Sequence, residues 1–195
     1  MANSGLNEEG GLLRGLAEAQ AEAANGRGLP PVERWNPPFC GTIDMRITRD
    51  GTWTYLGTPI RRPALVRLFS TILRREEDGS YVLVTPVERV GITVEDAPFL
   101  AVRAERLLDG KGPRITFLTN VGDMVIADKA HPIRVVTDAR TGEPRPYVHV
   151  RKGLEALIAR PVFYDLVAWG TEAQSPQGPI LTVESEGVAF SLGLL

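Results

Sequence analysis

The first pattern along the chain is helical. Between residues 7 and 25, apolar residues recur at three- and four-residue steps, and the glutamates of this stretch fall outside that stripe. The segment 29–41 that follows is rich in proline, so it cannot continue a helix or form a central strand. The pattern predicts an N-terminal helix and then an irregular connection. The residues of the predicted apolar stripe are Leu12, Leu13, Leu16, Ala19 and Ala23.

Strict alternation of apolar and polar residues begins at Ile43 and predicts a strand up to residue 48. Asp50 and Gly51 then supply the positive-φ turn of a tight hairpin, and Trp53 and Tyr55 alternate on the return strand. This hairpin is the most clearly patterned local element of the chain.

A second helix is predicted to open at Pro63, because proline suits the first helical turn, where a missing N–H costs nothing. Arg74 and Arg75 are expected in its last turn, where positive charge complements the helix dipole. Two strands are predicted after it, at 81–85 and 87–94, separated by a proline.

The second half of the chain repeats this order. Arg160-Pro161 lies 98 residues after Arg62-Pro63, and both dipeptides open an apolar helical pattern that is followed by strands. We interpret the repeated order as an internal duplication. The elements expected in this half are strands at 132–137 and 147–151, a helical turn at 154–160, the Arg-Pro helix, and strands at 180–184 and 188–192.

Three further antiparallel strands, at 99–108, 114–120 and 124–127, are assigned to the second unit, so the boundary falls near residue 95. The predicted organisation is an N-terminal helix and linker (1–28), an N-terminal α+β unit (29–95) and a β-rich C-terminal unit with one helix (96–195). The fold class is α+β: two small antiparallel-sheet units, each with a packed helix. The larger C-terminal sheet is expected to curl into a partial barrel.

The composition of the chain disfavours several classes of function. The 195 residues hold 22 Lys and Arg against 24 Asp and Glu, a formal charge of −2, so the basic excess typical of nucleic-acid binders is missing. One cysteine and two histidines make a metal site improbable. No apolar stretch approaches the length of a membrane span, and the start of the chain does not have the charge order of a secretory signal. We therefore expect a cytoplasmic protein.

Recognisable catalytic motifs are missing from the sequence: it has no phosphate-binding loop, dinucleotide fingerprint or nucleophile elbow. Cys40 is either a small packing residue or a reactive thiol. His149 shares a strand face with Tyr147 and Arg151, and this polar face either binds an anion or faces water. No catalytic residue and no cofactor are assigned.

The first hairpin offers a candidate anion site. Arg61 and Arg62 lie at a predicted helix start, where unpaired N–H groups add positive potential. Trp53 and Tyr55 either supply a stacking surface for a base or form the buried face of the hairpin.

Other polar residues lie at predicted strand ends. Thr85 and Glu88 flank the proline between two strands, and Asn120 and Asp123 lie at a hairpin tip. Turn chemistry explains these positions without function. Alternatively, the tips of the two units line a cleft between domains, a common location for ligand sites.

The segments 81–90 and 94–99, together with the Trp53 hairpin and the Arg-Pro helix, resemble an uncharacterised bacterial family catalogued as domain of unknown function 1285. The resemblance covers the chain from about Trp35 to the C-terminus. It implies a duplicated core, a C-terminal domain superficially like pleckstrin-homology folds, and a nucleotide-based ligand at the domain interface in signal transduction.

Three hypotheses follow. The first is a regulatory or sensor protein that binds a small anionic, nucleotide-like molecule, with no nucleic acid or membrane as partner. The second is an adaptor that docks another protein, such as a signalling protein. The third is an enzyme acting on a phosphorylated substrate, although no nucleophile–base pair is apparent. The ligand-binding residues predicted under the first hypothesis are Trp53, Tyr55, Arg61, Arg62, Thr85, Glu88, Asn120, Asp123 and Arg151.

Overall fold

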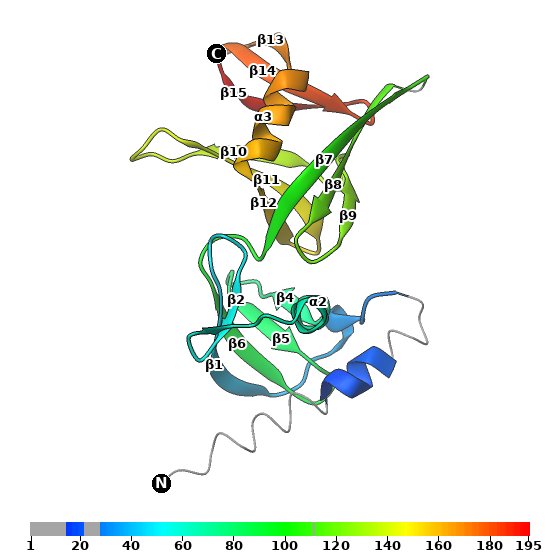
Figure 1. Cartoon of the computed structure of the whole chain (residues 1–195), viewed down its shortest axis with the longest axis vertical. Coiled ribbons are helices and arrows are strands. Elements are labelled where there is room, and N and C mark those ends of the chain that lie inside the picture. The colour runs from blue at the N-terminus through cyan, green and yellow to red at the C-terminus, as the bar shows by residue number, and fades with distance from the viewer. Residues whose placement is uncertain (1–14, 22–27, 111) are drawn as a thin grey trace. The chain divides into compact units, whose positions relative to one another are not determined.

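The computed structural model describes residues 15–21, 28–110 and 112–195 of the chain (Figure 1). It divides into two compact units, residues 1–95 and 96–195. Most of the helix predicted for residues 7–25 lies outside the described residues, but residues 15–21 are helical as expected.

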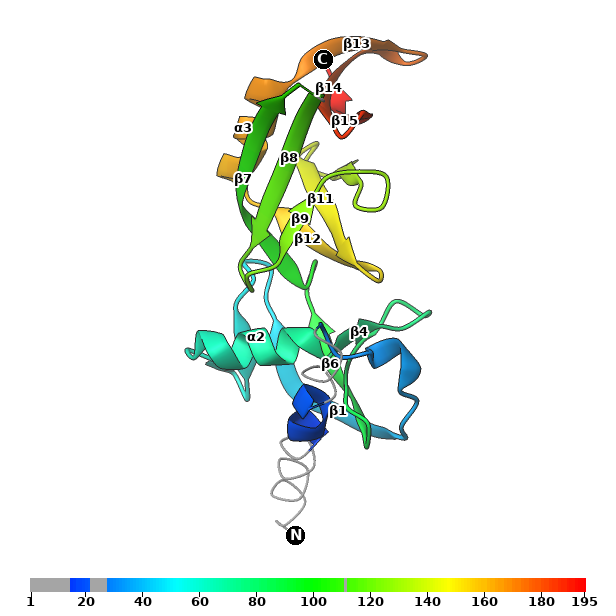
Figure 2. The ribbon, with the colours of Figure 1, turned by 90° about the vertical axis from the view of Figure 1, so that its right-hand side faces the viewer.

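The N-terminal unit is built on one six-stranded sheet, in the order β3-β2-β1-β6-β5-β4. All neighbouring strands are antiparallel except β1 and β6, which run parallel. One helix, α2, crosses a face of this sheet (Figure 2). The elements are η1 (Val32–Arg34), β1 (Phe39–Ile47), β2 (Trp53–Tyr55), β3 (Thr58–Pro59), α2 (Pro63–Thr71), β4 (Leu73–Arg75), β5 (Tyr81–Val84) and β6 (Arg89–Val94).

The predicted hairpin is present, with Ile47 paired to Trp53 and Gly51 at a φ of 81°. Its return strand delivers Trp53 into the core, where the indole is 1% exposed and stacks on Phe69 of α2 with ring centroids 6.3 Å apart. The hairpin and the last turn of α2 therefore share one apolar core. Leu83 and Ile72, both fully buried, belong to this core.

Two local predictions were wrong. The second helix ends at Thr71, and Leu73–Arg75 forms strand β4, because Leu73 pairs with Leu83 and Arg75 with Tyr81. Residues 154–158 form strand β12 and not a helical turn, because Ala156 and its neighbours pair with β7. In both places the sheet ladder outweighs a weak helical pattern.

The C-terminal unit holds a six-stranded sheet in the order β10-β11-β12-β7-β8-β9 and a separate three-stranded sheet, β13-β14-β15. Strands β12 and β7 are parallel, and α3 packs against β7 and β14. The elements are β7 (Phe99–Asp109), β8 (Gly112–Thr119), β9 (Met124–Ile126), β10 (Ile133–Thr137), β11 (Pro144–Arg151), β12 (Leu154–Ile158), α3 (Arg160–Trp169), β13 (Thr171–Ser175), β14 (Gly178–Ser185) and β15 (Val188–Leu194).

The two units repeat one order of elements. Pro63 and Pro161 both lie in the first turn of their helices, and each helix leads into an antiparallel run of three strands, β4-β5-β6 or β13-β14-β15. The α+β class is confirmed. The sequence analysis did not predict that each six-stranded sheet contains one parallel pair, nor that the three-stranded run forms a sheet of its own in the C-terminal unit.

No helix within the described residues is long and apolar enough to cross a membrane.

Candidate functional site

In the N-terminal unit, one end of the sheet gathers several predicted site residues. Trp53 pairs with Ile47, whose other neighbour is Val94, the last residue of β6. The Ile60 N–H donates to the Trp53 carbonyl at 2.8 Å, so Arg61 and Arg62 follow directly at this end. The chain leaves the unit here, after Glu95. We call this region the linker end of the N-terminal unit.

The exposed part of this region is cationic. Arg61 and Arg62 are both exposed, and neither side chain forms an ion pair or hydrogen bond with another described residue. Arg62 is the N-cap of α2 without a capping side chain, and Pro63 has no N–H, so Ala64 carries the first N–H of the helix. Two guanidinium groups beside a helix start can hold a phosphate or carboxylate.

The aromatic residues of this region are less exposed than the two arginines. Trp53 is buried in the core, so the prediction that its indole offers a stacking surface is wrong, and the alternative interpretation holds. Tyr55 is half-buried on β2, at the level of Met45. Arg46 pairs with Glu95 at 3.3 Å, and Glu95 also accepts the Arg49 N–H at 3.1 Å, so this carboxylate fixes the hairpin turn.

Thr85 and Glu88 lie at the opposite end of the same sheet. They precede Arg89, which pairs with Phe39 at the start of β1, whereas Trp53 lies beside the end of β1. The six residues of β6 separate the two ends by roughly 17 Å. Thr85 is fully buried, and its Oγ1 accepts the Glu88 N–H at 3.2 Å. These two residues therefore form a turn, and the prediction that they share a site with Arg61 is wrong.

In the C-terminal unit, three predicted site residues do come together. Arg151 at the end of β11 forms an ion pair with Asp123, and its guanidinium lies 4.8 Å from the ring centre of Phe99. Asn120, on the same β8–β9 connection as Asp123, accepts the Leu100 N–H at 3.0 Å through Oδ1. These residues surround the start of β7, the first strand after the linker. We call this region the linker end of the C-terminal unit.

A second polar cluster extends this region. The Asp96 carboxylate forms an ion pair with Arg145 and accepts a hydrogen bond of 2.8 Å from the Tyr147 hydroxyl. Burial of the hydroxyl and its bond to Asp96 raise the pKa of Tyr147 to about 12. The guanidinium of Arg134 lies 4.3 Å from the centre of the Tyr147 ring and pairs with Glu155.

The sequence analysis missed Asp96, Arg145 and Arg134. Tyr147 and Arg151 were recognised as sharing a strand face, and Arg145 lies on the same alternation. The partner Asp96 comes from 49 residues earlier in the chain, a separation that no local pattern reveals.

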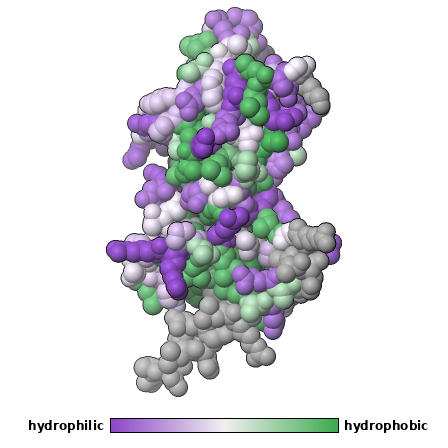
Figure 3. All heavy atoms as spheres, turned by 45° about the vertical axis from the view of Figure 1, so that its right-hand side comes forward, coloured by the Kyte–Doolittle hydropathy of each residue, from purple (hydrophilic) through white to green (hydrophobic). Residues whose placement is uncertain are grey.

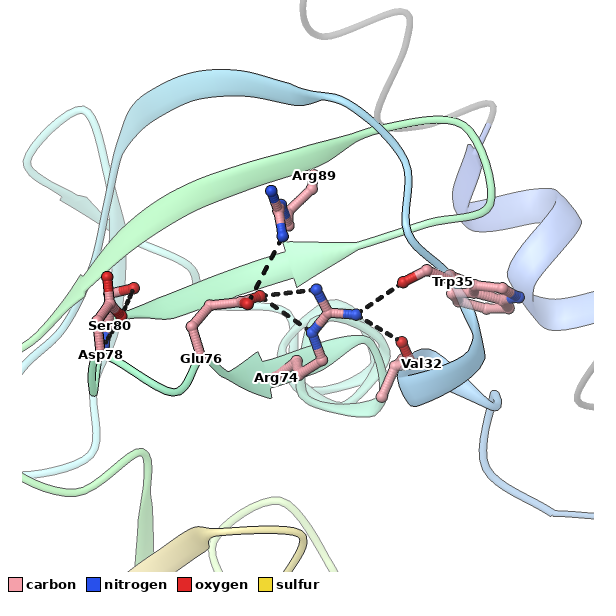
Figure 4. A network of polar contacts seen from close by, with 7 residues as sticks. All are labelled: Val32, Trp35, Arg74, Glu76, Asp78, Ser80 and Arg89. Carbon is pink, nitrogen blue, oxygen red and sulfur yellow. Dashed lines mark hydrogen bonds and ion pairs between the residues drawn. The ribbon is translucent and has the colours of Figure 1, made fainter.

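Another conspicuous network lies in the N-terminal unit (Figure 4). Arg74 donates to the carbonyls of Val32 and Trp35, both at 2.8 Å, and to the carboxylate of Glu76. Glu76 also lies 3.6 Å from Arg89. Because Arg74 bonds the carbonyl of the first residue of η1 and that of its C-cap, we interpret this network as a clamp that fixes the segment before β1.

A shallow open groove of about 510 Å³ lies beside this clamp. Two exposed carboxylates, Glu77 and Asp78, line its rim, and Asp78 accepts bonds from the N–H and hydroxyl of Ser80. Those hydrogen bonds lower the pKa of Asp78, as is usual for a turn residue. The two exposed carboxylates make this groove unfavourable for an anion.

Three features of the described residues bear on whether the chain could catalyse a reaction. Among residues 15–21, 28–110 and 112–195, no group of three or more His, Cys, Asp or Glu side chains could hold a metal ion. Cys40 is an exposed thiol. His149 donates from Nδ1 to the Ala130 carbonyl at 2.9 Å and accepts the Gly153 N–H at Nε2 at 3.1 Å, so its ring joins the β9–β10 connection to the β11–β12 turn.

Two family models match the chain. Residues 30–97 match the N-terminal domain described as a domain of unknown function (DUF1285), and residues 98–192 match the C-terminal domain of a protein of unknown function (DUF1285). The chain belongs to the DUF1285 family.

Solved structures of DUF1285 proteins agree with this fold. The structure of a family member from Silicibacter pomeroyi DSS-3 matches with 55% identity and a TM-score of 0.78, covering 85% of this chain and 87% of that chain. A second, from Shewanella baltica OS155, matches with 30% identity and a TM-score of 0.50, covering 64% of this chain and 90% of that chain. A search of curated proteins finds no match.

Proposed function

We propose that this DUF1285 protein is a non-catalytic regulatory protein of the cytoplasm that binds a small anionic, nucleotide-like ligand. The observation that carries the proposal is the exposed pair Arg61 and Arg62 at the start of α2, without partners among the described side chains. A phosphate group would supply the counter-charge and accept charge-assisted hydrogen bonds from both guanidinium groups.

Arg151 of the C-terminal unit is a second, separate candidate for anion binding. Its guanidinium lies 4.8 Å from the ring centre of Phe99 and is already paired with Asp123. An anion must compete with Asp123 for this guanidinium, so we infer that Arg151 binds an anion more weakly than Arg61 and Arg62 do.

The cytoplasmic location is part of the proposal. Cys40 is an exposed free thiol, which persists in a reducing compartment and is prone to oxidation elsewhere.

An adaptor function is the alternative, favoured by one specific observation. Large apolar side chains are exposed on the C-terminal unit: Leu107 and Leu108 are 54% and 71% exposed, and Met124 is 75% exposed. Apolar side chains are also visible among polar ones on the face shown in Figure 3. Scattered exposed apolar residues are normal, however, so this observation is weaker than the arginine pair.

A thermal-shift screen across mono-, di- and cyclic nucleotides tests the proposal. Ligand at 100 times its dissociation constant stabilises a native protein by about 2.7 kcal/mol, which raises the melting midpoint by roughly 5 to 11 °C for a chain of this size. The effect should largely disappear in Arg61→Ala or Arg62→Ala and should weaken as salt is added. Arg67→Ala is the matched control, because Arg67 is an exposed arginine further along α2.

Two results would contradict the proposal. One is a screen in which no nucleotide moves the midpoint beyond noise. The other is a shift that survives unchanged in Arg61→Ala and Arg62→Ala, which would place the ligand elsewhere.

A further inference from the structure

The contact between helix 15–21 and the rest of the N-terminal unit is unusually close. A Cβ atom added to Gly15 would lie 2.4 Å from Thr85 Oγ1 and 2.7 Å from Thr85 Cβ. Real Cβ atoms do not approach other atoms so closely, so the position accepts only glycine unless the helix shifts. The backbone of the helix at Gly15 therefore packs directly against the β5–β6 turn.

Two side chains of the helix, those of Leu16 and Ala19, are also buried. Leu16 is 2% exposed and Ala19 is fully buried, whereas Ala17, Glu18, Gln20 and Ala21 are exposed. Gly15 and Ala19 lie one turn apart and thus share a face of the helix. No ion pair or hydrogen bond links a side chain of helix 15–21 to another described residue. The contact depends on shape and apolar burial alone.

The surface that receives the helix extends beyond it. An open groove of about 350 Å³ is lined by Gln20 of the helix, by the segment 28–30, and by four residues of α2: Ala64, Arg67, Leu68 and Thr71. Leu29 in the segment 28–30 is 48% exposed. The helix thus fills only part of an apolar surface on the unit.

The helix lies outside the range that the family model of the N-terminal domain describes, which begins at residue 30. Most helical stability in proteins comes from packing of an apolar face and not from helix propensity. We therefore expect formation of this helix to be coupled to its docking.

From these observations we propose that the surface around Thr85 that contacts helix 15–21 is a helix-binding site. The helix that occupies this site can be exchanged for another copy of itself. Helix 15–21 fills the site in cis, and the same segment of a second copy of this chain fills it in trans. Each exchange replaces the contacts of Gly15, Leu16 and Ala19 by identical ones, which is the basis of domain swapping. This inference is independent of the proposed ligand site, which lies at the other end of the sheet.

The test uses the full chain and a synthetic peptide of residues 7–25. In the Gly15→Leu chain the helix cannot seat, so the site is open, and a fluorescent wild-type peptide should bind to it. In the Ala17→Leu chain the added leucine is exposed, so the cis helix stays docked and peptide binding should be at least about tenfold weaker. A peptide with Gly15→Leu should lose binding to the open site by a similar factor.

Folding and specificity controls complete the experiment. Ala19→Leu blocks the same contact at a second position and should reproduce the behaviour of Gly15→Leu if that chain is poorly folded. Hydrogen exchange of the Glu88 N–H, which is bonded to Thr85, reports the state of the receiving turn. Failure of the peptide to bind either opened chain would overturn the proposal, and so would equal binding to the Ala17→Leu chain.

Discussion

Single buried side chains set the stability of each unit. Leu166 of α3 is fully buried, whereas Leu68 of α2 is only half-buried and borders an open groove. Leu166→Ala should destabilise the chain by about 2 to 5 kcal/mol, because it leaves a cavity in a packed core. Leu68→Ala should cost less than half as much. Chemical denaturation of the two variants compares them, and equal losses would contradict the assignment of the helix faces.

One buried hydroxyl joins three separate segments of the C-terminal unit. Ser185 is fully buried, accepts the Ile115 N–H at 2.9 Å and donates to the Ala127 carbonyl at 2.7 Å. Ser185→Ala leaves both backbone groups unpaired and should cost about 1 to 3 kcal/mol. Ser191→Ala, at an exposed position of β15, is the matched control and should be nearly neutral in urea unfolding. A neutral Ser185→Ala would show that water replaces the hydroxyl.

Tyr147, in the polar cluster at the linker end of the C-terminal unit, makes the stability of the fold depend on pH in the alkaline range. The folded unit raises the pKa of Tyr147 to about 12, and the unfolded value is about 10. The folded state therefore favours the neutral phenol, so this stabilisation is complete below pH 10 and disappears as the pH rises towards 12. Unfolding free energies measured across this range should fall in the wild type and less steeply in Tyr147→Phe. Identical slopes in the two proteins would contradict the assignment.

At the scale of elements, the parallel pairing of β1 and β6 depends on a glycine. A Cβ atom added to Gly91 would lie 2.8 Å from Thr42 Oγ1. Gly91→Ala should destabilise the chain by about 1 to 3 kcal/mol through overpacking. Thr42→Ala removes the clashing hydroxyl, so the double variant should recover much of this loss. Thermal unfolding of all four proteins gives the coupling energy, and simple additivity would exclude the clash.

Elements with a clear local pattern were predictable and those fixed by strand pairing were not. The Asp50-Gly51 hairpin and the Arg-Pro helix starts follow from turn chemistry and helix propensity, and both are present. Strands β4 and β12 carry weak helical patterns and become strands because of their pairing partners: Leu83 on the next strand for β4, and Phe99 far along the chain for β12.

For the candidate site, too, the positions set by local sequence were predictable and the contacts between distant residues were not. The position of Arg61 and Arg62 at a helix start follows from the sequence pattern, whereas the pairing of Asp123 with Arg151 was not predicted. The burial of Trp53 depends on Phe69, and the contact of Asp96 with Tyr147 depends on the fold of β11. Separation of Thr85 from Arg61 depends on the parallel pairing of β1 and β6, which no local alternation signals.

At the scale of the whole molecule, the ligand proposal is specific to the N-terminal unit. Val94 ends β6 beside the hairpin that leads to Arg61, and α2 begins directly after Arg62. We therefore predict that the anionic ligand is recognised by Arg61 and Arg62 at the linker end of this unit. Thr85 and Glu88, at the far end of the N-terminal sheet, are assigned no ligand contact.

An NMR titration of the labelled full chain with the best nucleotide from the screen tests this claim most directly. We predict that the Ala64 amide and the Nε–H groups of Arg61 and Arg62 shift together, with one common dissociation constant. The Glu88 amide should stay unchanged. Shifts centred on the Thr85–Glu88 turn, with none at Ala64 or at the two arginines, would contradict the proposal.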